Sequence, residues 1–458
     1  MSRLTKENWT GRSVVVLGLA RSGVAVAKLL HHLGAKVVVN DLKPRSACPE
    51  ASELEALGIP VICGEHPDDL IHEQVEMLVK NPGIPYRAKP VQQALAAGVP
   101  VVTEVEIAGA LSEAPMIGIT GSNGKTTTTS LVGQILTRSQ VKCTVAGNIG
   151  QALADVVEQV TSGEWLVAEL SSFQLKGTDQ FRPRIAALLN VFPAHLDYHE
   201  TMEDYVASKR KVFANQEAGD IAVLNADSPV CREVAKTISS DIWWFSRTAP
   251  VEQGVYVQDG VIYVINEGQT QAILPVDEVA LHGDFNLENA LAAAAITLAA
   301  GATLDAVAQT LREFHGVEHR LEYVATINGV RYYNDSKATN AQAAIKALEA
   351  FTEPVVWIGG GLDRGVDFKE LVPVLRGRAK AVITYGQSKS ILAERGRDAG
   401  VPTVQVVDNL EEAVSRAAGL AQDGDVVLLS PACASWDQYT SFEERGSIFK
   451  QAVHRLQV

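Results

Sequence analysis

The sequence predicts an α/β protein with three α/β domains in series, over residues 1–104, 105–316 and 317–458. Three observations lead to this prediction. The chain has 458 residues, roughly three times a usual domain length of about 150. Short apolar runs alternate with helical patterns along it, which is typical of parallel sheets covered by helices. A glycine-rich loop with a lysine follows one apolar run, at residues 118–128.

The first section opens with a βαβ pattern. Apolar runs at residues 13–17 and 37–40 flank a helical pattern at residues 24–33, and Asp41 follows the second run. The first turn reads G-L-A-R-S-G over residues 18–23. This G-x-A-x-x-G turn predicts a Rossmann-like domain.

Ala20 occupies the position where a dinucleotide fingerprint has its middle glycine, which lets a pyrophosphate approach the backbone. NAD binding and a dehydrogenase are therefore disfavoured, whereas a nucleotide held in another way remains open. A second turn, N-P-G-I-P at residues 81–85, follows the apolar run 77–79. Open α/β sheets bind ligands at such strand ends.

The second section begins with the loop GITGSNGKTTT at residues 118–128, after apolar residues 115–117. The strict pattern G-x-x-x-x-G-K-[ST] would need glycine where the chain has Ile119, so the loop is a variant. In such a loop, backbone N–H groups face a triphosphate, Lys125 reaches the β- and γ-phosphates and Thr126 binds Mg²⁺. The loop predicts a P-loop ATP-binding domain with a parallel sheet; the alternative is a plain strand-to-helix connection.

Further apolar runs predict the remaining elements. In the second section, strands, a hairpin with an Asp-Gly turn and two helices are expected at residues 165–168, 185–191, 221–224, 255–265, 286–300 and 304–314. In the third section, an Asn-Gly hairpin and four strands are expected at residues 323–333, 355–358, 381–385, 403–407 and 426–429. Helical patterns between these strands predict a doubly wound third domain.

Composition narrows the partners. Lys and Arg number 40 against 54 Asp and Glu, a net charge of −14, which disfavours nucleic acid and anionic membranes as partners. The longest alanine-rich stretch, residues 290–300, is shorter than the ~20 residues that span a bilayer, and the N-terminus lacks the apolar segment of a signal peptide. Five scattered cysteines indicate a reducing compartment. We expect a cytoplasmic protein.

Several polar residues lie where the nucleotide's metal ion would be. Glu169 ends an apolar run in ELSSFQL, and His195 follows another in NVFPAHLDYH; a carboxylate and an imidazole can complete an Mg²⁺ shell. The alternative for both is a solvated loop residue. Lys209, in YVASKRKVF, is most simply part of a solvated helix face. A lysine with a lowered pKa instead reacts as the free amine, even with CO₂, and becomes an anionic metal ligand.

The third section has its own candidate binding residues. NDSKATN, residues 334–340, places Lys337 at a helix start, where N–H groups and an ammonium can bind a carboxylate; the alternative is an ordinary capped helix. SPACASWDQYTSFEERG, residues 430–446, follows another strand and suits a polar ligand. Arg364, after a glycine run, is long enough to reach a phosphate across a cleft, and His319-Arg320 are further candidates.

Together these features resemble the Mur ligases of peptidoglycan synthesis, over essentially the whole chain. The motifs that carry the resemblance are GSNGKTT, ELSSFQL, the histidine of HLD, GDFNLENAL, EHRLE, NDSKATN, GGGLDRG and SPACASWDQ. NDSKATN is similar to the branch that adds D-glutamate rather than to those that add L-alanine, a diamino acid or a dipeptide. Arg364 stands where some members have lysine, which keeps the charge but changes the donor geometry.

The resemblance implies site residues in each domain. The implied UDP-substrate residues are Gly18, Leu19, Ala20, Arg21, Ser22, Asp41, Asn81 and Gly83. The implied ATP residues are Gly121, Ser122, Asn123, Gly124, Lys125, Thr126, Thr127, Asn148, Asn286, Asn289 and Arg320. The implied metal ligands are Thr126, Glu169, His195 and Lys209, the last as a carbamate, and the implied catalytic residues are Lys125, His195 and Lys209. The implied D-glutamate residues are Lys337, Thr339, Arg364, Ser435 and Phe442.

The resemblance also implies the reaction. It is ATP-dependent amide formation between UDP-N-acetylmuramoyl-L-alanine and D-glutamate through an acyl phosphate, with one Mg²⁺ or two, by a monomer. Such chemistry depends on positioning and charge neutralisation more than on protein nucleophiles. A related Mur ligase or a folylpolyglutamate-type ligase with another amino acid or acceptor is the alternative. A non-enzymatic nucleotide switch would leave the third section without a role.

Overall fold

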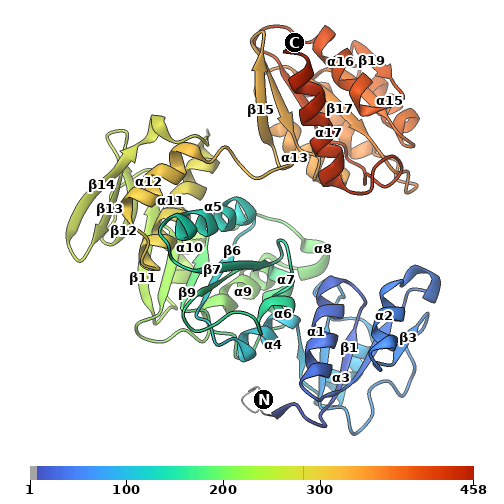
Figure 1. Cartoon of the computed structure of the whole chain (residues 1–458), viewed down its shortest axis with the longest axis vertical. Helices are drawn as coiled ribbons and strands as arrows, with labels where there is room; N and C mark the ends of the chain where they lie inside the picture. The colour runs from blue at the N-terminus through green and yellow to red at the C-terminus, as the bar shows by residue number, and fades with distance from the viewer. Residues whose placement is uncertain (1–7, 282, 458) are drawn as a thin grey trace. The chain divides into compact units, whose positions relative to one another are not determined.

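The computed structural model describes residues 8–281 and 283–457, and the chain divides into two compact units between Phe314 and His315 (Figure 1). The first unit holds two sheets and the second holds one. Helices pack on sheets whose strands are mostly parallel, so the predicted three-domain α/β fold is confirmed. The exact limits of the three domains remain a prediction.

The first sheet has five parallel strands in the order β3-β2-β1-β4-β5. Their bounds are β1 Ser13–Leu17, β2 Lys36–Asp41, β3 Val61–Cys63, β4 Met77–Lys80 and β5 Val101–Val102. The helices are α1 Arg21–His32, α2 Glu50–Ala56 and α3 Lys89–Ala96. Strand order reverses between β1 and β4, and the turns after these two strands are the ones that the sequence singled out. Ligands bind at such a switch point in open α/β sheets.

The second sheet has nine strands in the order β14-β13-β12-β11-β10-β9-β6-β8-β7. Their bounds are β6 Met116–Thr120, β7 Cys143–Gly147, β8 Trp165–Glu169, β9 Ile185–Leu188, β10 Ile221–Asn225, β11 Asp241–Ser246, β12 Gly254–Gln258, β13 Val261–Asn266 and β14 Gln269–Pro275. The predicted hairpin is confirmed, with Asp259 and Gly260 at φ +49° and +75°. The sheet departs from an all-parallel one, because β13 pairs antiparallel with both β12 and β14.

Helices cover this sheet and carry the site. Their bounds are α4 Glu104–Leu111, α5 Lys125–Arg138, α6 Leu153–Val156, α7 Ser172–Lys176, α8 Leu196–His199, α9 Met202–Arg210, α10 Pro229–Ala235, α11 Asp284–Ala299 and α12 Leu304–Glu313. Helix α11 is buried from Asn289 to Thr297, and it packs against α5 and against strands β9, β10, β11 and β12. Its small alanine side chains let it approach α5 closely, and this contact supports the start of α5.

The third sheet has six strands in the order β15-β16-β20-β17-β18-β19, parallel except for the β15–β16 hairpin. Their bounds are β15 Glu322–Ile327, β16 Val330–Asn334, β17 Val355–Gly360, β18 Ala379–Tyr385, β19 Thr403–Val406 and β20 Val426–Leu429. The helices are α13 Ala341–Glu349, α14 Val372–Arg378, α15 Lys389–Asp398, α16 Leu410–Leu420 and α17 Phe442–Arg455. One core cluster holds residues of α16 and α17 and the other holds residues of α13, α14 and α15, as expected of a doubly wound domain.

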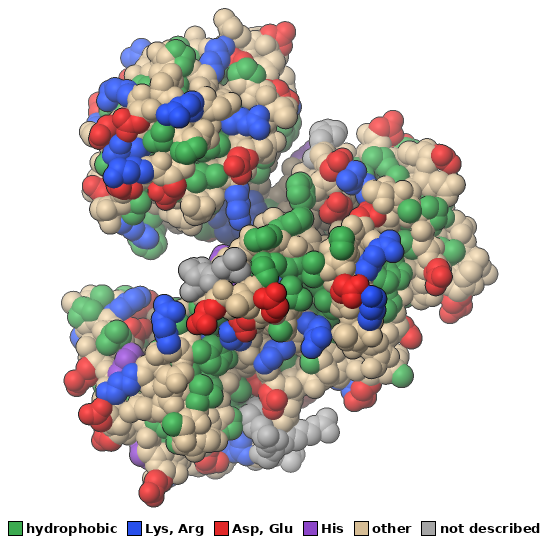
Figure 2. Space-filling view, turned by 180° about the vertical axis from the view of Figure 1, so that it is seen from behind, with side chains coloured by type: hydrophobic (Ala, Val, Ile, Leu, Met, Phe, Trp, Pro, Cys, Tyr) green, Lys and Arg blue, Asp and Glu red, His purple; other side chains and the backbone are tan. Residues whose placement is uncertain are grey.

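The surface mixes both signs of charge. Figure 2 shows acidic and basic side chains interspersed over the face that it presents. Within residues 8–281 and 283–457, no helix has both the length and the apolar character needed to cross a membrane.

Candidate active site

The two turns at the switch point of the first sheet contact each other. Gly18 has φ +102°, and a Cβ there would lie 2.9 Å from Cβ of Asn81, so glycine is required on both counts. The Leu19 N–H donates to Oδ2 of Asp41 at 2.7 Å. Asn81 Nδ2 donates to the Ser22 hydroxyl at 3.2 Å. These predicted UDP-substrate residues therefore form one connected group.

The remaining predicted UDP-substrate residues lie at the edges of this group. The Gly83 N–H donates to Oδ1 of Asn81 at 3.3 Å, which closes the second turn. Ala20 is the exposed N-cap of α1. The Arg21 guanidinium donates to the carbonyl of Gly150, so it reaches the second domain of this unit.

The phosphate loop is held from the neighbouring strand end. Asn190 accepts from the Ser122 N–H with its backbone oxygen and from the Asn123 N–H with Oδ1, each at 3.0 Å. Gly124 has φ +82°, and a Cβ there would lie 2.0 Å from Oδ1 of Asn289. Only glycine fits this contact, which joins the loop to α11. Lys125 Nζ donates to the carbonyl of Gly121 at 2.9 Å and Thr126 is buried.

Lys209 reaches the same loop from helix α9. Its side chain is buried, with 1% of the residue exposed, so the solvated-face interpretation of Lys209 is wrong. Nζ donates to the Gly121 carbonyl at 2.8 Å and lies 4.6 Å from the centre of the Tyr205 ring. Burial, and then the charge of Lys125, lower the pKa of Lys209 to about 6. The residue at this place is therefore an amine at neutral pH.

Glu169 lies beside the phosphate loop's strand. It ends β8 and pairs with Ile119 of β6, two residues before Gly121. The side chain is buried, so the solvated interpretation is wrong for Glu169. Oε1 accepts from Asn148 Nδ2 at 2.8 Å, whereas the buried Oε2 has no hydrogen-bond donor among the described residues. A buried carboxylate oxygen without a donor fits a cation ligand.

His195 stands at the start of helix α8 in the left-handed region, with φ +57°. Its exposed ring lies 5.0 Å from the ring of Phe173 and 6.4 Å from that of Tyr205, measured between centroids. The Tyr205 hydroxyl lies 2.9 Å from the Ser122 hydroxyl. Tyr205 thus connects His195 with the phosphate loop, next to Lys209.

The first two turns of helix α11 carry the predicted ATP residues Asn286 and Asn289. Thr128 Oγ1 lies 3.5 Å from Oδ1 of Asn289, and Asn286 lies one turn earlier on the same helix. Phe285, beside Asn286, has its ring 6.2 Å from that of Phe192, whose N–H donates to the Ser122 hydroxyl at 2.9 Å. Thr127 lies in the first turn of α5. The structure therefore brings the predicted ATP residues of the first unit to one loop.

Arg320 belongs to the second unit, together with all the predicted D-glutamate residues. Lys337 Nζ lies 5.6 Å from the centre of the Phe442 ring, and the Ser336 hydroxyl donates to the Phe442 carbonyl at 2.8 Å. The Thr339 N–H donates to the Lys337 carbonyl at 2.9 Å. Lys337 and Phe442 therefore face each other across two segments that lie far apart in the sequence.

The glycine run joins the same group. The Leu362 N–H donates to the Ala434 carbonyl at 2.9 Å, next to the buried Ser435. The Arg364 guanidinium lies 5.2 Å from the centre of the exposed Trp436 ring. Asn340 caps α13 by accepting from the Ala343 N–H at 2.9 Å, so the capped-helix interpretation of NDSKATN describes its end correctly.

Sequence reasoning missed Arg445 and Asp335 as organising residues of this group. Arg445 is fully buried; it donates to the Ser336 carbonyl at 2.8 Å and to the Gly360 carbonyl at 3.4 Å. Burial raises the pKa of Asp335 to about 7, and its Oδ2 accepts from the Ser430 hydroxyl at 2.8 Å. Both residues lie within quoted motifs, Asp335 in NDSKATN and Arg445 near the end of residues 430–446, and that position was the signal that could have found them.

Three family descriptions match consecutive parts of the chain. "Mur ligase MurD-like, N-terminal domain" matches residues 12–103, "Mur ligase middle domain" matches residues 119–297, and "Mur ligase, glutamate ligase domain" matches residues 319–433. A protein of Geobacillus kaustophilus (strain HTA426), named UDP-N-acetylmuramoylalanine--D-glutamate ligase, is 52% identical over 446 residues, 97% of this chain and 98% of that one. The chain belongs to the Mur ligase family.

Other relatives agree with this assignment. A Bacillus subtilis (strain 168) protein of the same name is 50% identical to this Mur ligase over 96% of its chain and 97% of the relative's. A crystal structure of MurF from Acinetobacter baumannii covers 96% of this chain and 93% of its own, with a TM-score of 0.54 and 18% identity. At that identity the likeness shows the shared fold.

Proposed function

We propose that this Mur ligase uses ATP to join D-glutamate to UDP-N-acetylmuramoyl-L-alanine in peptidoglycan precursor synthesis. One observation carries the proposal: Lys125 and Lys209 both donate to the Gly121 carbonyl, beside the buried carboxylate of Glu169. This arrangement suits a metal-bound triphosphate. The names of relatives at 52% and 50% identity support the choice of substrates.

The reaction has two steps. An oxygen of the alanyl carboxylate attacks the γ-phosphorus of ATP. The bond from this phosphorus to the β-phosphate oxygen breaks, so that ADP leaves and an acyl phosphate remains. The D-glutamate amine then attacks the acyl carbon, phosphate leaves, and the amine gives up a proton as the amide forms. Lys125 neutralises negative charge on the transferring phosphoryl group in the first step.

Thr126, Glu169, His195 and Lys209 are the residues that would hold Mg²⁺. The ion, when bound, neutralises phosphate oxygens and orients the triphosphate. The donor-free Oε2 of Glu169 is the observation that fits such an ion. The protein's own contribution is to hold the phosphate loop through Asn190 and to keep Glu169 away from water.

Carbamylation of Lys209 belongs to this proposal. The amine attacks CO₂, a carbon–nitrogen bond forms, one proton is released, and the side chain becomes an anion. Burial favours the reactive neutral amine, because the pKa of Lys209 falls to about 6. A carbamate at this place would supply a second anionic ligand beside Glu169.

Lys337, Thr339, Arg364, Ser435 and Phe442 form the proposed D-glutamate pocket. Lys337 is the proposed partner of the side-chain carboxylate, because its ammonium lies over the Phe442 ring at a helix start that also offers N–H groups. A cytoplasmic location and a monomeric state remain predictions.

Phosphate release tests the function. The assay combines Mg²⁺ and ATP with a panel of UDP-muramoyl substrates and amino acids, with each component omitted in turn. We expect turnover only when ATP, Mg²⁺, UDP-N-acetylmuramoyl-L-alanine and D-glutamate are present together. Equal phosphate release from ATP alone would contradict the proposal, and preferred use of another amino acid would assign the chain to another branch of the family.

A further inference from the structure

Lys80 ends β4, directly before the turn at residues 81–85, and its side chain is almost fully buried, with 1% of the residue exposed. Its Nζ donates to the carbonyls of Asn81 at 3.3 Å and Pro82 at 3.2 Å. It also donates to the hydroxyl of Tyr198 at 3.1 Å. Three oxygens therefore lie within hydrogen-bond distance of one Nζ, two in the turn and one in the second domain of this unit.

Tyr198 holds the same turn at a second point. Its hydroxyl donates to the Ile84 carbonyl at 3.4 Å while it accepts from Lys80. Ile84 in turn packs against the backbone of Gly18, since a Cβ on that glycine would lie 3.0 Å from its Cδ1. The phenol of Tyr198 is thus joined to both ends of the turn that contacts the glycine turn of the first sheet.

Tyr198 lies on helix α8, and this helix starts at the predicted metal ligand. The backbone N–H groups of Tyr198 and His199 donate to the His195 carbonyl at 3.1 and 3.0 Å. The Phe173 ring packs edge-on against the Tyr198 ring, with centroids 4.5 Å apart. A shift of Tyr198 therefore moves the first turn of α8 together with His195.

A second lysine fixes the aromatic rings from the other side. The ammonium groups of Lys80 and Lys176 both lie over the rings of Tyr86 and Tyr198, 5.0 to 5.8 Å from the ring centres. Lys176 is held by Asp204 at 2.6 Å, and Asp204 also lies 2.9 Å from Nδ1 of His199. This ion pair holds the Lys176 ammonium over the rings of Tyr86 and Tyr198.

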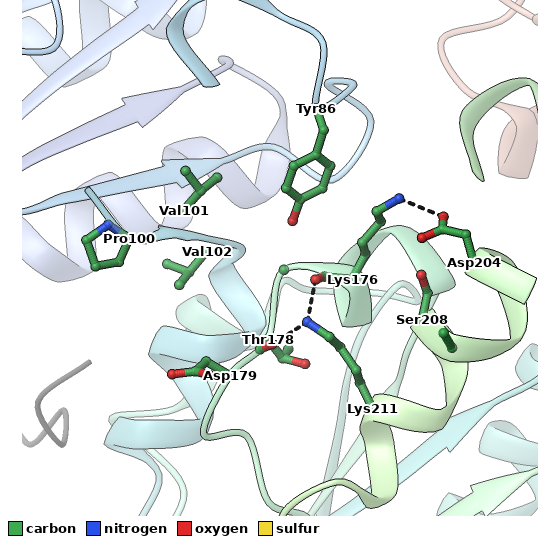
Figure 3. A pocket seen from close by; sticks show the side chains of 12 residues that line it. Tyr86, Pro100, Val101, Val102, Lys176, Thr178, Asp179, Asp204, Ser208 and Lys211 are labelled. Atoms are coloured by element: carbon green, nitrogen blue, oxygen red, sulfur yellow. Dashed lines mark hydrogen bonds and ion pairs between the residues drawn. The ribbon is translucent and has the colours of Figure 1, made fainter. Parts of the chain in front are cut away.

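Figure 3 shows where this network meets solvent. Tyr86, from the first domain, points into a cavity of about 500 Å³ that Lys176 and Asp204 of the second domain also line. Lys80 is buried and is not among the residues that line this cavity, whereas Lys176 is. Water can therefore reach the Lys176–Asp204 pair but not the contacts that Lys80 makes.

We propose that Lys80 and Tyr198 are positioning residues that clamp the 81–85 turn of the UDP-substrate site to helix α8, and so align the bound substrate with the phosphate loop. This inference rests on the proposed function, which places the UDP substrate at Asn81 and Gly83. Neither residue touches the reacting atoms in this proposal. They act by fixing the turn, and the reaction needs the alanyl carboxylate in line with the γ-phosphorus.

Steady-state kinetics of Lys80→Met, Lys80→Gln and Tyr198→Phe test the clamp. Methionine fills the space without donors, glutamine keeps a donor of similar reach, and phenylalanine removes only the hydroxyl. Lys89→Met and Tyr323→Phe are matched controls at exposed positions. Thermal midpoints show whether each variant folds.

We expect Lys80→Met to raise KM for UDP-N-acetylmuramoyl-L-alanine about 10- to 100-fold, the usual effect of removing hydrogen bonds made by a charged group. KM for ATP and for D-glutamate should change less than about twofold. Tyr198→Phe should raise the same KM by a smaller factor, and Lys80→Gln should restore part of the loss. Calorimetric binding of the UDP substrate without ATP should weaken in parallel.

Two results would overturn the clamp. One is a Lys80→Met enzyme with unchanged KM and affinity for the UDP substrate. The other is an equal rise in KM for all three substrates together with a lower thermal midpoint, which would give Lys80 a purely structural role. If the wild-type enzyme fails to turn over these substrates at all, the proposed function fails instead, and the binding experiment separates the two cases.

Discussion

Lys80 and Lys209 are two buried lysines of the same unit with different surroundings. Each is 1% exposed, and burial lowers the pKa of both, to about 7 for Lys80 and about 6 for Lys209. Lys80 donates to three oxygens, whereas Lys209 donates to the carbonyl of Gly121 beside the phosphate loop. Burial favours the neutral amine of both lysines. The neighbouring groups therefore decide whether the lysine reacts with CO₂, as proposed for Lys209, or holds a turn, as proposed for Lys80.

The largest expected effect is at Lys209. Lys209→Ala removes the proposed carbamate, and turnover should fall at least about 10³-fold, as for other groups that stabilise transferring phosphate. Acetate or formate should restore part of it by occupying the anion position. Phosphate release with and without added carboxylate measures both effects.

Lys80→Met is the matched control for that rescue. Its loss should appear in KM for the UDP substrate, and acetate should leave it unchanged. A fully active Lys209→Ala enzyme, or rescue of both variants by acetate, would contradict the different roles proposed for the two lysines.

Lys125, whose charge helps to lower the pKa of Lys209, tests the role of the phosphate loop in catalysis. Lys125→Ala removes a positive charge at the transferring phosphoryl group, and kcat should fall about 10²- to 10⁴-fold. Lys142→Ala, at an exposed lysine in the same domain, should keep wild-type kcat. Near-normal turnover of Lys125→Ala would show that the loop is a structural connection only.

Lys337 is a third lysine for comparison, one that is only partly buried. Lys337→Ala leaves the substrate's side-chain carboxylate without a partner, which should weaken D-glutamate use by about 2 to 5 kcal/mol. Affinity for ATP and the UDP substrate should stay the same. Kinetics with D-glutamate and D-alanine decide the matter: the pocket assignment is wrong if the variant keeps its kcat and KM for D-glutamate, or if the wild-type enzyme uses D-alanine equally well.

The smallest expected effect is the contribution of Lys80 to the pH dependence of the free energy of unfolding. The unfolded chain keeps this proton up to pH about 10.4, while the folded protein releases it near 7, so the unfolded state binds more protons in that window. Wild-type stability should therefore gain with rising pH above 7 relative to Lys80→Met. Urea midpoints of the wild type and Lys80→Met at about pH 6 to 9, a range that brackets the folded-state pKa of Lys80 of about 7, measure the difference.

The groups that face Lys80 leave this sign unchanged. Burial raises the pKa of Tyr86 to about 12 and raises that of Tyr198 as well, so both phenols stay neutral in the window. Lys176 is paired with Asp204, whose pKa is lowered through its bonds to Lys176 and His199 although burial opposes this. If the stability of the wild type relative to Lys80→Met falls with rising pH, the buried neutral amine is contradicted. The stability of Lys89→Met should change with pH as that of the wild type does.

Local motifs predicted most of the fold. The phosphate loop and both hairpin turns are contiguous, and Gly124, Gly260 and Gly329 have the positive φ that these turns need. Strand β14 was missed because its residues are mostly polar and exposed, so no alternating apolar pattern marks it. Strand β7 was missed as well, and its first three residues are only partly buried.

The surroundings of the two lysines could not be predicted from local sequence. Lys209 lies 88 residues from Gly121, and Lys80 lies 118 residues from Tyr198. A KRK cluster is usually solvated, and only the packing of α9 against the loop buries the first lysine of this one, Lys209. For Lys209 the local pattern favoured a solvated face, whereas the family resemblance implied a place at the nucleotide site; Lys80 carried no signal beyond its place at the end of an apolar run.

Carbon-13 NMR of the enzyme in ¹³C-bicarbonate tests the comparison most directly, because it detects a carbamate without turnover. Spectra of the wild type, Lys209→Ala and Lys80→Met are compared at neutral pH. The account predicts one protein carbamate signal in the wild type and in Lys80→Met, and none in Lys209→Ala. A wild type without the signal, or a signal that survives Lys209→Ala and disappears in Lys80→Met, would contradict it.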